Sequence, residues 1–209
     1  MPLAILLSAT DLSALLCSRI CHDLISPIGA INNAIELYDE GIANEDALQL
    51  IRTSGVSASD RLQFMRIAFG EVSKKNTEIN TSDVRNVARQ YMSNEKTKLS
   101  WNGPDLLLPK KEVKLLLNLI LLADASIPRG GHIDLTLQQK NQYSNFRIVC
   151  TGTMLLVPPK FMELYGGTFP EESIDVHSIQ FYYTLWLAEI TKMPLQITIT
   201  RQEITFCAR

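Results

Sequence analysis

The sequence predicts an α+β protein in which a two-helix hairpin precedes an α/β sandwich domain. Up to about residue 75 the apolar residues recur only at helical spacing, whereas helical and alternating patterns are mixed beyond it. The connection around Gly41 is short, so the two helices should run antiparallel. In the second part, predicted strands outnumber helices, which favours one sheet with helices on one face. We therefore assign residues 1–75 to the hairpin and residues 76–209 to the sandwich domain.

Composition and charge exclude several classes of protein. Of 209 residues, 46% are hydrophobic and 20% are charged, which is typical of a globular chain. The net charge of -2 and the lack of an extended basic patch argue against a nucleic-acid partner. The apolar start lacks the basic residues of a secretory signal, and the most apolar run, Leu115 to Ala123, is too short to span a membrane. Four cysteines fit reduced thiols, so we expect a soluble cytoplasmic protein.

Two long helices are expected in the hairpin. Thr10 or Asp11 can cap the first, which should run to Glu40 and stop at Gly41. The second should begin after Asn44 and end near Phe69, with a heptad seam of apolar or small residues. That seam consists of Leu48, Ile51, Gly55, Ala58, Leu62, Met65 and Phe69.

A two-helix hairpin has too small a core to be stable alone. A second copy of the chain would complete it as a four-helix bundle, which we regard as the economical solution. The alternative is that the hairpin folds back on the C-terminal half.

The sandwich domain should follow a polar linker over residues 71–80. Its expected helices cover residues 81–94, 110–125 and 178–191, and its expected strands cover residues 98–101, 132–138, 145–151, 195–200 and 203–208. The stretch with Pro158, Pro159, Gly166 and Gly167 is typical of a loop.

His22 is the candidate catalytic residue of the first helix. At 100° per residue, the apolar side chains fall between about 80° and 240° from His22, so the imidazole should face water. The surface around it is mostly small and polar, and consists of Asp11, Leu15, Ser18, Arg19, Ser26, Gly29 and Asn33. Pro27 inside a helix removes a backbone hydrogen bond at a cost of about 3 kcal/mol, so we expect a kink beside His22.

Two other residue groups allow more than one interpretation. Cys17 and Cys21 lie four residues apart and could hold zinc, but no further ligands have suitable spacing. We therefore expect two small buried cysteines and no metal site. His132 and His177 have no comparable setting and are interpreted as ordinary polar residues.

Residues 22–27, of sequence HDLISP, resemble the H-box of sensor histidine kinases, whose histidine accepts a phosphoryl group. A second stretch resembles the N-box region of the kinase ATP-binding domain, through Asn118, Leu119, Ala123, Pro128, Gly130, Gly131 and Ile133. In this register Leu122 replaces the asparagine that holds magnesium in the family, and Cys150 replaces the acid that binds adenine. The resemblance implies a degenerate histidine-kinase-like ATPase fold without a nucleotide site, and hence no cofactor and no ATP-dependent autokinase.

The hairpin and the degenerate domain together resemble the ChpT-type histidine phosphotransferases of alphaproteobacterial phosphorelays. The matching stretches are residues 16–23, 29–33, 127–131 and 157–161. The resemblance implies a homodimer that relays a phosphoryl group through His22. The donor would be the receiver domain of a hybrid histidine kinase, and the acceptors response regulators of the cell-cycle type. The receiver would bring its own magnesium.

The same resemblance suggests which residues contact a receiver domain. The candidates surround His22 and are Leu15, Ser18, Arg19, Asp23, Ser26 and Gly29. Arg19 and Asp23 could equally be solvated helix charges, and Leu15 could contact another helix of the bundle. A non-catalytic dimeric scaffold that binds receivers is the alternative function.

Overall fold

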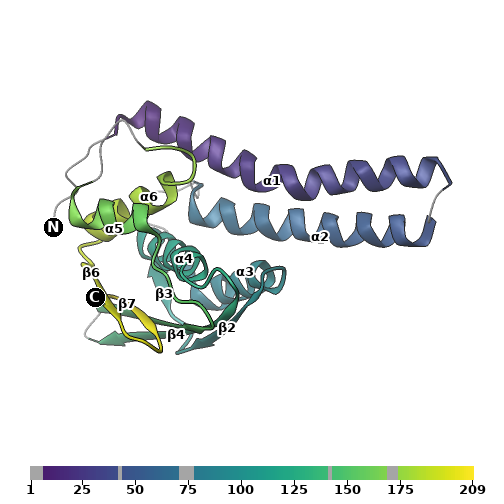
Figure 1. The fold of residues 1–209 in the computed structure, drawn as a ribbon. Coiled ribbons are helices and arrows are strands. Elements are labelled where there is room, and N and C mark those ends of the chain that lie inside the picture. The colour runs from purple at the N-terminus through teal and green to yellow at the C-terminus, as the bar shows by residue number, and fades with distance from the viewer. Residues whose placement is uncertain (1–6, 42–43, 71–77, 141–142, 169–173) are drawn as a thin grey trace.

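The chain folds into a helical hairpin joined to a mixed helix-and-sheet domain (Figure 1). The structure, a computed structural model, describes residues 7–41, 44–70, 78–140, 143–168 and 174–209. Helix α1 (Ala9–Asp39) and helix α2 (Asn44–Ala68) lie side by side and project beyond the domain. Ser8 caps α1, because its hydroxyl accepts a hydrogen bond from the amide of Asp11 at 3.1 Å. The cap therefore lies earlier than the expected Thr10 or Asp11.

Among its described residues, the C-terminal part contains one five-stranded sheet, one two-stranded sheet and four helices. The helices are α3 (Thr81–Ser93), α4 (Lys110–Ala125), α5 (Pro159–Gly166) and α6 (Ile179–Ile190). The strands are β1 (Glu78–Asn80), β2 (Thr97–Asn102), β3 (Leu107–Pro109), β4 (Gly131–Lys140), β5 (Tyr143–Gly152), β6 (Leu195–Ile199) and β7 (Ile204–Ala208).

The large sheet has the order β2-β4-β5-β7-β6, with β2 and β4 parallel and the other pairs antiparallel. Its helices lie on one face, as Figure 1 shows. Helix α4 is the centre of the core, since residues 115 to 123 are all buried, and its bounds confirm the helix expected over 110–125.

Two features differ from the expectations. Strands β1 and β3 form a small antiparallel sheet, and β1 lies at the end of the expected linker, whose residues 71–77 are outside the described part of the chain. The expected loop at Pro158 contains α5, because Pro159 suits the first turn of a helix and Gly167, at φ 71°, supplies a left-handed C-cap.

The hairpin shares its core with the domain at one end only. Near the end of α2, Phe64, Met65, Ala68 and Phe69 pack into the main hydrophobic cluster of the C-terminal part. In α1, by contrast, only Pro27 and Ala34 are buried. By length and composition alone, α1 is also the one helix among the described residues that could cross a membrane, and its apolar window is not buried. The hairpin thus presents a large apolar surface to its surroundings.

Candidate functional site

His22 lies on the solvent side of α1, close to the C-terminal domain. Its side chain is 57% exposed, in agreement with the helical-wheel prediction. The first half of α1 packs against α6, where Leu12, Leu15 and Leu16 join a cluster with Ile179 and Tyr182. The hydroxyl of Tyr182 also accepts a hydrogen bond from the amide of Leu7 at 3.1 Å. The domain therefore anchors the part of α1 that carries His22.

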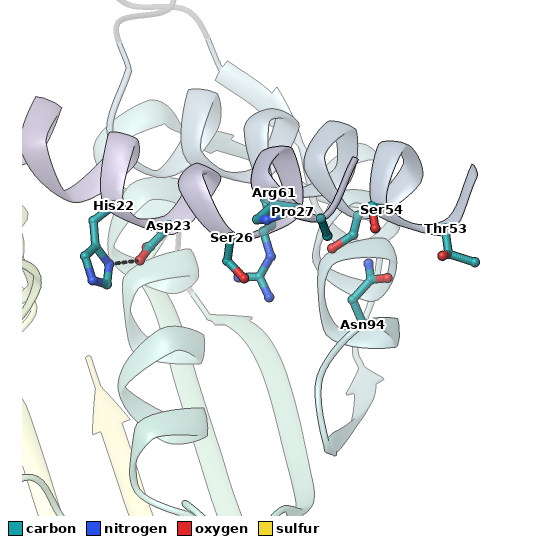
Figure 2. Close-up of a pocket in the computed structure, with 10 residues that line it drawn as sticks. His22, Asp23, Ser26, Pro27, Thr53, Ser54, Arg61 and Asn94 are labelled. Carbon is teal, nitrogen blue, oxygen red and sulfur yellow. Dashed lines mark hydrogen bonds and ion pairs between the residues drawn. The ribbon is translucent and has the colours of Figure 1, made fainter. Parts of the chain in front are cut away.

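Asp23 connects His22 to Arg19. Arg19 Nε donates to Asp23 Oδ2 at 2.8 Å, and His22 Nδ1 lies 3.2 Å from Asp23 Oδ1 (Figure 2). The Asp23 side chain is only 12% exposed, and each of its two carboxylate oxygens has a partner on the same helix. A carboxylate at Nδ1 favours the tautomer with its proton there, which leaves the lone pair on Nε2. The outward nitrogen of His22 is then ready to act as a nucleophile.

Pro27 lies one turn after Asp23, inside a helix that continues without interruption. Proline has no N–H to donate to the carbonyl oxygen four residues earlier, and here that oxygen belongs to Asp23. Figure 1 shows the axis of α1 changing direction near its middle, as the proline predicts. The Pro27 side chain itself is buried.

A cavity of about 480 Å³ lies beside His22, between the hairpin and the end of α3. Figure 2 shows its labelled residues in a row from His22 to Thr53. Its walls are mostly small or polar, and consist of His22, Asp23, Ser26, Pro27, Ala30, Thr53, Ser54, Ser57, Arg61 and Asn94. Small and polar residues of this kind could form hydrogen bonds with polar groups of a docked protein.

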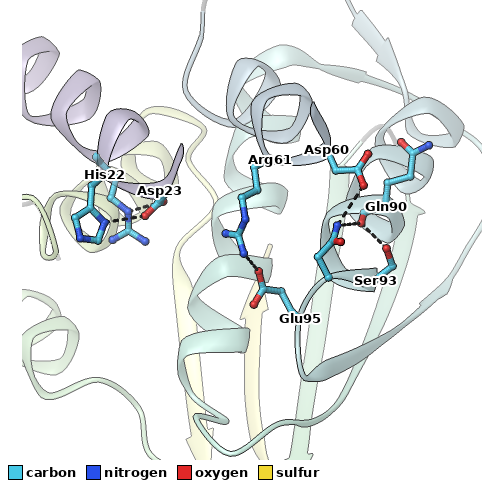
Figure 3. Close-up of polar contacts among 9 residues, drawn as sticks. His22, Asp23, Asp60, Arg61, Gln90, Ser93 and Glu95 are labelled. Carbon is cyan, nitrogen blue, oxygen red and sulfur yellow. Dashed lines mark hydrogen bonds and ion pairs between the residues drawn. The ribbon is translucent and has the colours of Figure 1, made fainter. Parts of the chain in front are cut away.

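Arg61 is the cation of this cavity, and the sequence analysis missed it. Its guanidinium donates to Glu95 Oε1 at 2.6 Å (Figure 3) and lies over the ring of Tyr91. Burial raises the pKa of Glu95, although the charge and hydrogen bond of Arg61 oppose that shift. Next to this pair, Asn94 Nδ2 donates to Asp60 Oδ2 at 3.2 Å. Two polar links thus tie α2 to the end of α3.

The predicted receiver-contact residues differ in exposure and in whether they line the cavity. Ser26 and Asp23 line the cavity, Ser18 is exposed, and Gly29 is half-buried with open space where a side chain would begin. The expected exposure of Leu15 is wrong: the side chain is half-buried against α6 of its own chain. The hairpin folds back on the domain at this end, which the wheel of a single helix cannot reveal.

The cysteines of α1 also differ from the prediction. Cys17 and Cys21 are both exposed rather than buried, because no other element of the described chain covers their side of α1. Among the described residues, no three His, Cys, Asp or Glu side chains gather closely enough to hold a metal ion.

A second histidine, His177, touches His22. The two rings meet edge to face, with centroids 5.2 Å apart and planes at 86°. The prediction that His177 has no special setting is wrong, because the turn before α6 brings it to α1. His132 lies elsewhere, on β4, where its Nε2 is 2.9 Å from Ser100 Oγ.

The two positions where a kinase would hold a nucleotide lie in the core. Leu122 and Cys150 are fully buried within the main hydrophobic cluster. Burial, and to a lesser extent the charge of Asp124, raises the pKa of the Cys150 thiol to about 12, so this cysteine is a neutral core residue.

Comparison with known proteins identifies a family, a relative and a solved structure to which this chain is similar. The model of the family "Histidine phosphotransferase C-terminal domain" matches residues 81–203. The protein phosphotransferase ChpT of Brucella abortus (strain 2308) is 53% identical over 208 residues, which is 100% of each chain. A solved structure of a bacterial phosphotransferase is 53% identical and superposes with a TM-score of 0.94, over 99% of this chain and 100% of the other.

Proposed function

The chain belongs to the ChpT-type histidine phosphotransferase family, and on that premise we propose that it relays phosphoryl groups through His22. The observation that carries the proposal is the pairing of an exposed imidazole with a largely buried carboxylate at its Nδ1. A phosphocarrier histidine must be accessible and oriented, and this pairing meets both needs.

The transfer is a pair of displacements at phosphorus. The lone pair of His22 Nε2 forms a bond to the phosphorus of an aspartyl phosphate on a donor receiver domain. The P–O bond to that aspartate breaks, and its electron pair remains on the departing carboxylate. The phosphorylated ring carries a positive charge, which the carboxylate of Asp23 at Nδ1 offsets. An aspartate of the acceptor receiver then takes the phosphoryl group and restores the neutral imidazole.

We assign receiver docking to the surface around His22. Ser18, Arg19, Ser26 and Gly29 offer small or polar side chains on α1, and the adjacent cavity adds Arg61 from α2. The magnesium ion that phosphoryl transfer needs would come with the receiver. The donor in this proposal is the receiver of a hybrid kinase, the acceptors are response regulators of the cell-cycle type, and the protein itself acts in the cytoplasm.

We also propose that two copies of the chain form a four-helix bundle. The hairpin exposes large apolar side chains along its length that a second hairpin would cover. They are Ile28, Ile35, Leu37 and Tyr38 on α1 and Leu50, Val56 and Leu62 on α2. Exposed apolar surface of this extent marks an interface in a soluble protein. This arrangement accounts for the apolar character of α1 without a membrane.

The protein should not use ATP. The buried Leu122 and Cys150 leave neither a magnesium ligand nor an adenine acceptor at the positions that a kinase uses. The degenerate domain would instead support the hairpin and extend the surface that a receiver contacts.

The deciding experiment follows labelled phosphate onto the chain. Full-length wild type, His22→Ala and His132→Ala are each incubated with labelled ATP alone, and separately with a labelled phosphoreceiver domain. We expect acid-labile label on wild type and His132→Ala, only from the receiver, and none on His22→Ala.

Other outcomes separate the alternatives. Label from ATP alone would mean that the domain still binds nucleotide. No label from the phosphoreceiver, together with receiver binding that survives His22→Ala, would identify a non-catalytic scaffold.

A further inference from the structure

The ring contact between His22 and His177 joins residues that lie 155 positions apart in the chain. His22 belongs to α1, whereas His177 belongs to the turn that leads into α6. Edge-to-face packing at a centroid distance of 5.2 Å is the geometry that aromatic rings prefer. The exposed imidazole of His22 is therefore restrained from the C-terminal domain as well as from Asp23.

The turn that carries His177 is held in place by Asp175. One carboxylate oxygen, Oδ1, accepts from the amide of His177 at 3.1 Å and from the amide and hydroxyl of Ser178 at 2.8 and 2.7 Å. The other, Oδ2, accepts from Lys160 Nζ at 2.6 Å. Ser178 is fully buried, and its hydroxyl oxygen accepts a hydrogen bond from the amide of Asp175 at 2.8 Å. The backbone at His177 thus has a defined position.

The same turn is docked on α1 by apolar contacts. Ile179 and Tyr182 of α6 are fully or nearly fully buried and pack in one cluster with Leu15 and Leu16 of α1. Leu15 and Leu16 lie about two turns before His22 on the helix. The position of His177 relative to His22 is therefore set by packing on one side and by the Asp175 network on the other.

We propose that His177 is a positioning residue for phosphotransfer, which holds the plane of the His22 imidazole while a receiver docks. The proposal rests on the proposed function of His22. A hydrogen bond at Nδ1 restrains one atom of the ring but leaves the ring free to rock about that contact. A second ring against it removes this freedom, so that Nε2 is directed consistently at the incoming phosphorus. The C-terminal domain thereby contributes directly to the histidine site.

The test compares three variants of the full-length protein: His177→Ala, His177→Phe and the control His132→Ala. Transfer from a phosphoreceiver is measured over a range of receiver concentrations, which separates the maximal rate from the KM for the receiver. We expect His177→Ala to lower the maximal rate about three- to tenfold with little change in KM. His177→Phe keeps an aromatic ring and should recover most of that rate, and His132→Ala should match wild type.

A second readout reports on the His22 ring itself. In nuclear magnetic resonance spectra of unphosphorylated protein, His177→Ala should shift and broaden the His22 ring signals, while His132→Ala should leave them unchanged. Thermal unfolding of each variant checks that the fold is kept, as expected for an exposed side chain.

The outcomes distinguish this inference from the proposed function. If wild type accepts the phosphoryl group and His177→Ala does so at the same maximal rate, the positioning role is overturned and His22 remains the carrier. A change confined to KM also overturns it, since His177 would then contact the receiver. If wild-type protein accepts no label from any phosphoreceiver, the proposed function fails, and the positioning role fails with it.

Discussion

Asp23 shows how one carboxylate can serve two neighbours on a helix. Arg19 takes one oxygen and His22 the other, and the three residues lie within four positions of each other on α1. Residues four apart face the same side of a helix, so Arg19 reaches Asp23 directly. The hydrogen bond from Arg19 also fixes the orientation of the Asp23 carboxylate, whose other oxygen faces His22 Nδ1.

Asp175 gives a prediction for acid stability. Burial acts to raise its pKa, but the hydrogen bonds from Lys160 and Ser178 outweigh burial and hold the pKa well below the usual 3.8. A carboxyl with a lowered pKa stabilises the fold fully above its unfolded pKa, and that stability is lost as the pH falls through the folded value. Asp175→Asn should therefore lower the free energy of unfolding at pH 7 by about 1 kcal/mol. The effect is no larger because the side chains of the Lys160–Asp175 pair are partly exposed to solvent.

Urea unfolding at several pH values checks this prediction. The difference between wild type and Asp175→Asn should be constant near neutrality and should shrink below about pH 4. Asp39→Asn, at the exposed far end of α1, is the control and should have little effect. A difference that grows as the pH falls would contradict a lowered pKa for Asp175 in the folded protein.

For single residues, the sequence predicted the features that depend on the spacing within one helix. The exposure of His22 and the nearness of Asp23 and Arg19 follow from helical spacing, and the structure has all three. The half-burial of Leu15 and the position of His177 depend on α6, more than 150 residues away. Periodicity carries no information on such contacts, and an exposed histidine in a turn has no signature of its own.

Among the elements, α1 has two halves with different surroundings. The first half packs on α6 of its own chain, through Leu12, Leu15 and Leu16. The second half projects beyond the domain, and Ile28 and Ile35 are 48% and 43% exposed there. Pro27 lies close to the division between the halves.

The projecting half gives a prediction for assembly. Ile28→Glu should raise the dissociation constant of the proposed dimer by about two to three orders of magnitude, because each of its two symmetric copies would bury an unpaired charge in place of an apolar side chain. Ile199→Glu is the matched control, since Ile199 is 56% exposed but lies on β6 of the C-terminal part, not on the hairpin. Analytical ultracentrifugation measures both variants. A dimer as tight as wild type in Ile28→Glu would contradict this arrangement.

Most elements were predictable because their local patterns are strong. The bounds of α4 agree with the prediction, and β4 and β5 extend only one or two residues further at each end than expected. The three-residue strands β1 and β3 are too short to show alternation, and each becomes a strand only by pairing with the other. In α5 the paired prolines suggested a loop, yet a proline at a helix start is favourable.

For the molecule as a whole, α2 and the C-terminal domain share one core. Phe64 of α2 is fully buried and stacks on Tyr91 of α3 with centroids 4.3 Å apart. The Arg61–Glu95 pair lies beside this contact. Residues 1–75 and 76–209 remain a useful division of the sequence, but the packing at the end of α2 gives no reason for the two parts to unfold separately.

This shared core predicts a single unfolding transition. Both tryptophans, Trp101 and Trp186, lie in the C-terminal part, so their fluorescence reports on the domain. Far-UV circular dichroism reports mainly on helix, of which α1 and α2 are the longest segments. The two signals should change at the same temperature, and Phe64→Ala should lower both midpoints together through a loss of about 3–5 kcal/mol.

Leu107→Ala, at an exposed side chain of β3, is the control for Phe64→Ala and should leave both midpoints near their wild-type values. Loss of the helical signal well before the fluorescence change would mean that the hairpin melts independently of the domain.

The division of α1 also constrains how related chains can diverge. Where Leu12, Leu15 or Leu16 is replaced in a homologue, the accompanying change should appear in α6 of the same chain, since those are the side chains in contact. In the proposed dimer, replacements at Ile28 or Ile35 would instead be matched by residues of the hairpin of the second copy. Covariation along this one helix would therefore change from pairs within a chain to pairs between chains near Pro27.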